Sequence, residues 1–115
     1  PQYCGATFHN ITLKADAGDI LHQVTPELNI NDGIHDVGVK TVIAERRDLT
    51  LLLKKRENID NWSFKKQKGS GKLFITSDFK PYHLRSIYTL FENKIVEKYL
   101  KGELRNQKPK LVKGI

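Results

Sequence analysis

Apolar and polar residues alternate along several stretches of this chain, and alternation with a period of two is typical of a strand with one buried face. The first stretch predicts a strand near residues 6–14. Four more strands are predicted between residues 35 and 77, in HDVGVKTVIAE, DLTLLLKKR, IDNWSFKK and GKLFITS. In the second of these, Leu49, Leu51 and Leu53 share one face. The connections are of hairpin length, so residues 37–77 predict an antiparallel meander.

The segment between residues 15 and 33 permits two interpretations. Asp16 or Asp19 is a suitable cap for a short helical turn, and the same residues also suit another strand. Pro26 and the Asn-Asp-Gly run at 31–33 end whichever element forms, because these residues are typical of turns.

The hydrophobic period changes after residue 80. Six apolar residues then recur at 3.6 residues per turn: Leu84, Ile87, Tyr88, Phe91, Ile95 and Tyr99. Pro81 suits a first turn, Ser77 or Asp78 suits the cap, and Gly102 suits the stop. The pattern predicts a helix from about residue 80 to 101, packed through its apolar stripe across the sheet.

The predicted fold is therefore α+β, with a curved antiparallel meander of five or six strands and one long C-terminal helix. Residues 1–104 form a single domain in this interpretation, and residues 105–115 form a basic, mobile tail. The order of elements is similar to that in repeats of the PUR and Whirly single-strand nucleic-acid-binding proteins. It is also similar to that in polo-box and PH-like domains. The likeness is one of outline, so it implies no role for any residue.

Composition limits the class of protein. The 115 residues suit one domain, and the 38% hydrophobic content predicts a thin core. A single cysteine, Cys4, excludes an internal disulfide and a multi-cysteine zinc site. The single cysteine fits an intracellular, reducing location, in the cytoplasm, the nucleus or an organelle. No apolar run approaches the length of a membrane span, and the chain does not begin with the apolar segment of a signal peptide. The absence of methionine indicates either removal of the initiator or a fragment of a longer protein.

Charge is divided unevenly along the chain. Residues 1–45 hold two lysines against six acidic residues, a net charge of −4, whereas residues 46–115 hold 18 basic and seven acidic residues, a net charge of +11. Such asymmetry favours a partner of opposite sign, such as nucleic acid, an anionic membrane surface or an acidic protein. A basic protein that only needs solubility has the same composition.

The basic residues are densest between residues 54 and 72, beside the only tryptophan. This predicts a nucleic-acid-binding site at Lys54, Lys55, Arg56, Trp62, Lys65, Lys66, Lys68 and Lys72. The two basic clusters belong at opposite edges of a meander. Trp62 and Phe64 are either core residues or an outward platform for bases, which stack at about 1–3 kcal/mol each. Phe74 is the next candidate for that platform. Lysines at hairpin ends also protect edge strands from pairing, which is the alternative role.

Enzyme motifs are weak in this sequence. The Gly-Asp at 18–19 and the later ERRD are similar to the pattern of metal-dependent nucleases, in which Asp19 and Glu45 would hold the ion. The pattern departs at Arg47, which replaces a lysine, and at Asp48, which comes too early. His9, His35 and Asp36 would have to meet in space to serve a ribonuclease. The GSGK at 69–72 precedes a predicted strand, so it does not suit a phosphate-binding loop.

These observations predict a non-enzymatic domain that binds RNA or single-stranded DNA, with no cofactor and no metal, as part of a larger protein or complex. The alternative is a protein-interaction domain, polo-box-like or PH-like in outline, and a phosphoinositide-binding domain is a third possibility. The support for a partner chain or a homodimer lies in three apolar residues off the helical stripe: Leu90, Val96 and Leu100.

Overall fold

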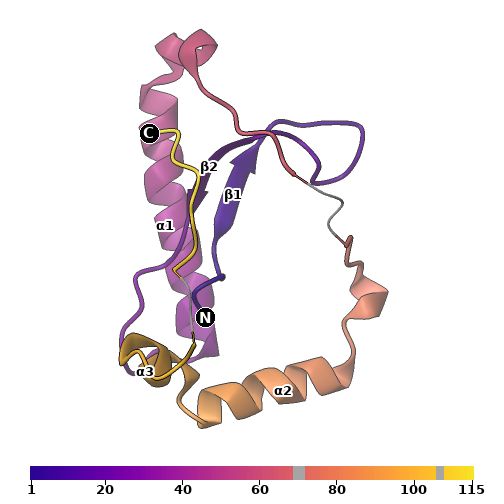
Figure 1. The fold of residues 1–115 in the computed structure, drawn as a ribbon, viewed down its shortest axis with the longest axis vertical. Helices are drawn as coiled ribbons and strands as arrows, with labels where there is room; N and C mark the ends of the chain where they lie inside the picture. Colours follow the sequence, from indigo (N-terminus) through magenta and orange to yellow (C-terminus); the bar gives the residue numbers. More distant parts are fainter. Residues whose placement is uncertain (69–71, 106–107) are drawn as a thin grey trace.

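The chain forms a two-stranded sheet packed on one long helix, with two shorter helices beyond it (Figure 1). The computed structural model describes residues 1–68, 72–105 and 108–115. In chain order the elements are β1 (Ala6–His9), β2 (Ile20–Val24), α1 (Ile34–Lys54), the 3₁₀ helix η1 (Arg56–Asn61), the 3₁₀ helix η2 (Thr76–Asp78), α2 (Pro81–Glu92) and α3 (Ile95–Leu100).

The sheet is smaller than the sequence pattern predicted. β1 and β2 pair antiparallel, from Ala6 opposite Val24 to His9 opposite Ile20, with an irregularity between Phe8 and His9. Within the described ranges they are the only strands, so the predicted meander of five or six strands is wrong. The first predicted strand ends earlier than expected, at His9. The uncertain segment before residue 33 contains a strand, β2.

Residues 34–54 form α1, and the two strands predicted within this segment are wrong. The backbone N–H of Gly33 donates to Asp36 Oδ2 at 2.8 Å, which satisfies a free amide at the start of the helix. Asp36 lies in the first turn and Lys54 in the last. Each charge is opposite in sign to the partial charge at its end of the helix, so both stabilise the helix dipole. Lys40 Nζ binds Asp32 at 2.7 Å and ties the preceding loop to the helix.

The other two predicted strands are also wrong. IDNWSFKK runs through the end of η1 into an extended segment, which pairs with β2 only at Lys65. Residues 72–75 are irregular, and η2 begins at Thr76. The predicted loop at 69–71 lies outside the described residues. Without the meander, the likeness to PUR, Whirly, polo-box and PH-like outlines no longer applies to this chain.

The predicted C-terminal helix is two helices. α2 begins at Pro81 as predicted, but its cap is Lys80, whose backbone N–H donates to His83 Nδ1 at 2.9 Å. The break falls at Lys94, which has a left-handed φ of 56°. Gly102, with a φ of 72°, follows α3 at the predicted stop, since glycine adopts this conformation at little cost.

The apolar stripe of the predicted helix does not pack across a sheet. No residue of α2 is buried, and Leu84, Tyr88 and Leu90 are all exposed. The buried residue of this region is Val96, only 1% exposed, which the sequence pattern had assigned to a free surface. Val96 is therefore excluded from any docking face, whereas Leu90 and Leu100 stay accessible.

The C-terminal tail lies alongside β2, in contrast to the expected mobile tail (Figure 1). Gln23 N–H donates to the Val112 carbonyl at 2.8 Å, and Gln23 Oε1 accepts from Val112 N–H at 3.1 Å. A Cβ on Gly114 would lie 2.5 Å from the Leu21 carbonyl oxygen, so only glycine permits this approach. β2 therefore holds three segments: β1, the residues around Lys65, and the tail.

The fold is open and its core is thin. The radius of gyration is 16.2 Å, against about 13 Å for a compact chain of this length. The accessible surface is 9288 Å², against about 6,400 Å² for a folded monomer of this mass. The buried apolar residues are Leu21, Val24, Val37, Ala44, Leu52 and Val96. None of the described helices is long and apolar enough to cross a membrane.

Two adjacent leucines of α1 test the position of this core. Leu52 is 2% exposed and Leu51 is 42% exposed. Leu52→Ala should lower the free energy of unfolding by about 2–5 kcal/mol, because it leaves a cavity. Leu51→Ala changes helix propensity equally and should cost about 1 kcal/mol or less. Denaturant unfolding measures both, and equal losses would contradict the described orientation of α1.

Candidate functional site

The predicted basic residues lie on two different kinds of structure. Lys54 ends α1, Lys55 follows it, and Arg56 begins η1. The second cluster, Lys65, Lys66 and Lys68, lies on the extended segment beside β2. The expectation that they occupy opposite edges of a meander is wrong, because neither cluster belongs to a hairpin. We call Lys54, Lys55, Arg56, Lys65, Lys66, Lys68 and Lys72 the basic segment.

All seven side chains of the basic segment are exposed, and none forms an ion pair with any residue that the structure describes. Some cations elsewhere do form such pairs, in Lys40–Asp32, Arg47–Asp48, Arg47–Glu27, Lys94–Glu97 and Lys101–Glu97, whereas others, among them Lys98, Lys108 and Lys110, form none with the described residues. The basic segment therefore presents positive charge that the fold leaves without carboxylate partners.

Backbone contacts hold the second cluster in place. Ile20 N–H donates to the Lys65 carbonyl at 2.8 Å, and Lys65 N–H donates back at 2.7 Å. Gln67 Nε2 donates to the carbonyls of Asp16, at 2.9 Å, and Gly18, at 2.6 Å. These bonds join residues 65–67 to β2 and to the loop before it. The flexible lysine side chains therefore extend from a backbone that is tied at two points.

The aromatic residues are only partly available. Trp62 and Phe64 are half-buried, so they are neither core residues nor an open platform. Phe74 is 70% exposed, and Lys72 Nζ lies 4.8 Å from the centre of its ring. A cation at this distance is attracted to the ring face. Phe74 is thus the exposed aromatic residue that the structure places next to a predicted binding lysine.

Sequence reasoning missed a buried pair of ionisable residues. His22 is 1% exposed, and its Nε2 lies 2.8 Å from Asp48 Oδ2. Gly114 N–H donates to His22 Nδ1 at 3.1 Å, so Nε2 carries the proton and donates to Asp48. Arg47 Nε donates to Asp48 Oδ1 at 2.8 Å. Both ring nitrogens are occupied and the ring is closed to solvent, so this pair joins β2, α1 and the tail rather than serving acid–base catalysis.

The Asp48 carboxyl is stabilised as an anion. Burial opposes ionisation, but hydrogen bonds from Arg47 and His22 outweigh it and hold the pKa of Asp48 below its ordinary value. The same contact with Asp48 raises the pKa of the Arg47 guanidinium. His22 and Asp48 are 26 positions apart in the sequence, a separation that matches no motif, so spacing alone gave no signal of this contact.

The residues considered for nuclease chemistry lie on different elements, Asp19 in the loop before β2 and Glu45 on α1. Glu45 lies on α1, whereas the nuclease pattern requires a strand at that position. His9 is close to Asp16, at 3.8 Å, while Asp36 binds the Gly33 amide. Across the described parts of the chain, no three histidine, cysteine or acidic side chains gather where they could hold a metal ion.

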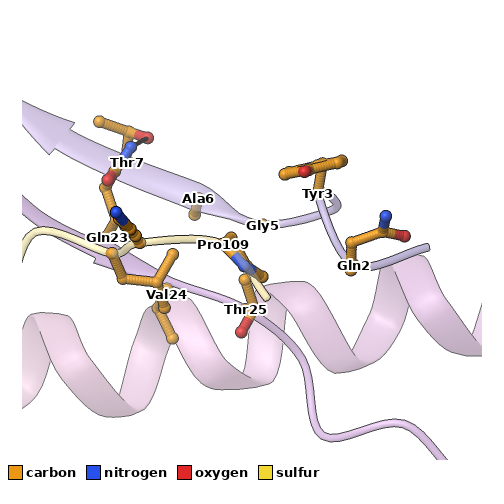
Figure 2. A pocket seen from close by; sticks show the side chains of 11 residues that line it. Gln2, Tyr3, Gly5, Ala6, Thr7, Gln23, Val24, Thr25 and Pro109 are labelled. Carbon is orange, nitrogen blue, oxygen red and sulfur yellow. Dashed lines mark hydrogen bonds between the residues drawn. The ribbon is translucent and has the colours of Figure 1, made fainter. Parts of the chain in front are cut away.

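A shallow pocket of 290 Å³ lies between the N-terminal residues, the end of β2 and the tail. Figure 2 shows Thr7 and Gln23 side by side on the paired strands, with Pro109 of the tail beneath Ala6 and Gly5. Gln23 Nε2 donates to Thr7 Oγ1 at 3.3 Å. The lining includes Lys110 and Tyr3 but no carboxylate and no histidine, so it offers no acid–base pair.

No protein-family model, curated protein or solved structure that was compared with the chain matches it. Any function must therefore be argued from the chain's own residues.

Asp48 gives the fold a defined response to acid. Its ordinary pKa is about 3.9 in an unfolded chain, and the folded value is lower. Its stabilising contribution is thus complete above about pH 5 and is lost as the pH falls through the folded pKa. Urea midpoints between about pH 6 and pH 2 should fall less steeply for Asp48→Asn than for the wild type.

Asp60→Asn is the matched control, because Asp60 is exposed and forms no ion pair with the described residues. The urea midpoint of Asp60→Asn should depend on pH in the same way as that of the wild type. Parallel profiles for the wild type and Asp48→Asn would show that this carboxylate does not stabilise the fold.

Proposed function

We propose that the chain binds nucleic acid, RNA or single-stranded DNA, through the basic segment, and that it does so without catalysis. The observation that carries the proposal is the set of seven exposed cations with no carboxylate partner among the described residues. Phosphates would supply the missing anions, and release of counterions would drive the association.

The preference for single strands rests on Phe74. A base in a single strand is free to stack on an exposed ring, whereas a base in a duplex is already stacked. Lys72 lies against this ring and is near enough to contact the phosphate of a base stacked there. Trp62, half-buried, would contribute one edge rather than a full face.

Removal of the second cluster tests the proposal. The triple variant Lys65→Ala, Lys66→Ala, Lys68→Ala should weaken binding to RNA and DNA similarly across sequences. Each lost phosphate contact should reduce the salt dependence by about 0.7 to 0.9 log units of affinity per log unit of salt. Filter binding at several salt concentrations measures both effects. Thermal stability should hardly change, because the three side chains are exposed.

A second triple variant separates position from net charge. Lys98, Lys108 and Lys110 are exposed and form no ion pair with described residues, and changing them to alanine removes the same charge. This control should keep most of the affinity and salt slope. Equal losses of affinity in the two triple variants would indicate that a diffuse basic surface binds the nucleic acid. No loss of affinity in the Lys65, Lys66 and Lys68 variant would show that these lysines serve only solubility.

The proposal also predicts that bound nucleic acid stays intact. Labelled RNA and DNA incubated with the chain and Mg²⁺ or Mn²⁺ should show no cleavage on a denaturing gel. Glu45→Ala is the informative variant, since Glu45 is the nuclease-like residue on α1. Cleavage by the wild type that disappears in Glu45→Ala would overturn the non-enzymatic assignment.

A further inference from the structure

α1 is apolar on two sides. Its buried residues, Val37, Ala44, Asp48 and Leu52, face the rest of the fold. A second row of residues lies nearly opposite them, at about 100° of rotation per residue. We call this row the outer stripe: Val39, Val42, Arg46, Leu49 and Leu53. Its four apolar members are 41–62% exposed.

The spacing of the outer stripe is that of a helix-pairing seam. Its members are separated by three, four, three and four residues, which is the heptad spacing that brings one helix against another. Figure 1 shows β1, β2 and the tail together on one side of α1, while the loop before α1 and α3 lie on the other side near its N-terminal end. The four apolar residues of the outer stripe are nevertheless exposed among the described residues. A helix face that only contacts water does not need apolar residues at heptad spacing. The spacing of the outer stripe therefore suits packing against a second helix.

The exposed area is sufficient for such an interface. The chain exposes 9288 Å², nearly 3,000 Å² more than the value of about 6,400 Å² typical of a folded monomer of its mass. A standard interface buries about 800 Å² on each partner. Pairing through the outer stripe therefore fits well within the excess.

Charge at the two ends of α1 indicates the occupant and its direction. Asp36 and Lys54 are both exposed and lie 18 residues apart, which is five turns, so they share one flank of the outer stripe. In an antiparallel pair of identical helices, this flank meets its counterpart. Asp36 of each copy then faces Lys54 of the other, at both ends. In a parallel pair, Asp36 would instead lie near Asp36 of the other copy and Lys54 near Lys54, which brings like charges together.

We infer that the outer stripe is a homodimer interface, in which α1 packs antiparallel against α1 of a second copy of the chain. This places the interface on α1 rather than on the C-terminal helices that the sequence pattern had indicated. Leu49 and Leu53 fill the seam, and the two Asp36–Lys54 pairs fix the direction. The inference is independent of nucleic-acid binding, and its test uses none.

Sedimentation of the full chain over a series of concentrations tests the interface. The wild type should approach twice the chain mass of 13.2 kDa. The double variant Val42→Lys, Leu49→Lys replaces two of the four apolar stripe residues, adds like charges to those of Arg46 and should raise the dissociation constant by at least about tenfold. Lysine suits a helix, so circular dichroism should stay that of the wild type. The matched control, Leu90→Lys with Leu100→Lys, should stay dimeric.

A wild type that is monomeric at every concentration would overturn the inference and leave the stripe to a partner of another sequence. A dimer that survives the seam variant but dissociates in the control would overturn it as well, and would place the interface on α2 and α3.

Disulfide trapping tests the direction and does not depend on the seam variant. In a Cys4→Ser background, Arg46→Cys lies in the outer stripe, one residue from the midpoint between Asp36 and Lys54, so two copies should crosslink under mild oxidation. Leu53→Cys should not, because this register separates its two copies by about 24 Å along the helix axis and a disulfide needs Cα atoms within about 7 Å. Crosslinking of Leu53→Cys, or none at Arg46→Cys, would contradict the antiparallel dimer.

Discussion

The hydrogen-bonded pair of His22 and Asp48 is the contact on which the arrangement of this small fold depends. It joins the central strand β2 to α1, and through the Gly114 amide it also holds the tail. Removing one partner of a buried hydrogen bond commonly costs about 1–3 kcal/mol, and more where the remaining group is charged, because that group loses its partner where water cannot replace it. With so few buried apolar residues, a loss of that size would be a large part of the stability of the domain.

β2 transmits this constraint to the predicted binding residues. Its backbone pairs with β1, with Lys65 and with the tail, so one strand positions segments that are distant in the sequence. Lys65 itself pairs with Ile20, Lys66 and Lys68 follow it closely, and Gln67 fixes the same stretch to the loop before β2. A cluster of exposed lysines on a tied backbone loses less conformational freedom on binding than one on a free loop.

The sequence predicted local features better than the fold. The start of the first strand, the start of a helix at Pro81 and the stop at Gly102 are confirmed, because each depends on short-range chemistry. The meander failed because α1 has apolar residues on both sides, so Leu49, Leu51 and Leu53 alternate as a strand would. Exposure of the lysines followed from their charge, whereas the contacts of His22 with Asp48 and of Lys72 with Phe74 depend on the tertiary fold.

The two proposals constrain each other at the end of α1. Lys54 belongs to the basic segment and also to the charge pair that would fix the direction of the dimer. A lysine held by Asp36 of a second copy has less charge to offer to a phosphate, so in a dimer Lys65, Lys66, Lys68 and Lys72 would carry most of the phosphate contacts. The antiparallel arrangement also places the two basic segments at opposite ends of a helix about 30 Å long. A single strand that reaches both would bind the second segment at the high effective concentration set by the first. Dimerisation through the outer stripe would therefore strengthen binding without any new contact to nucleic acid.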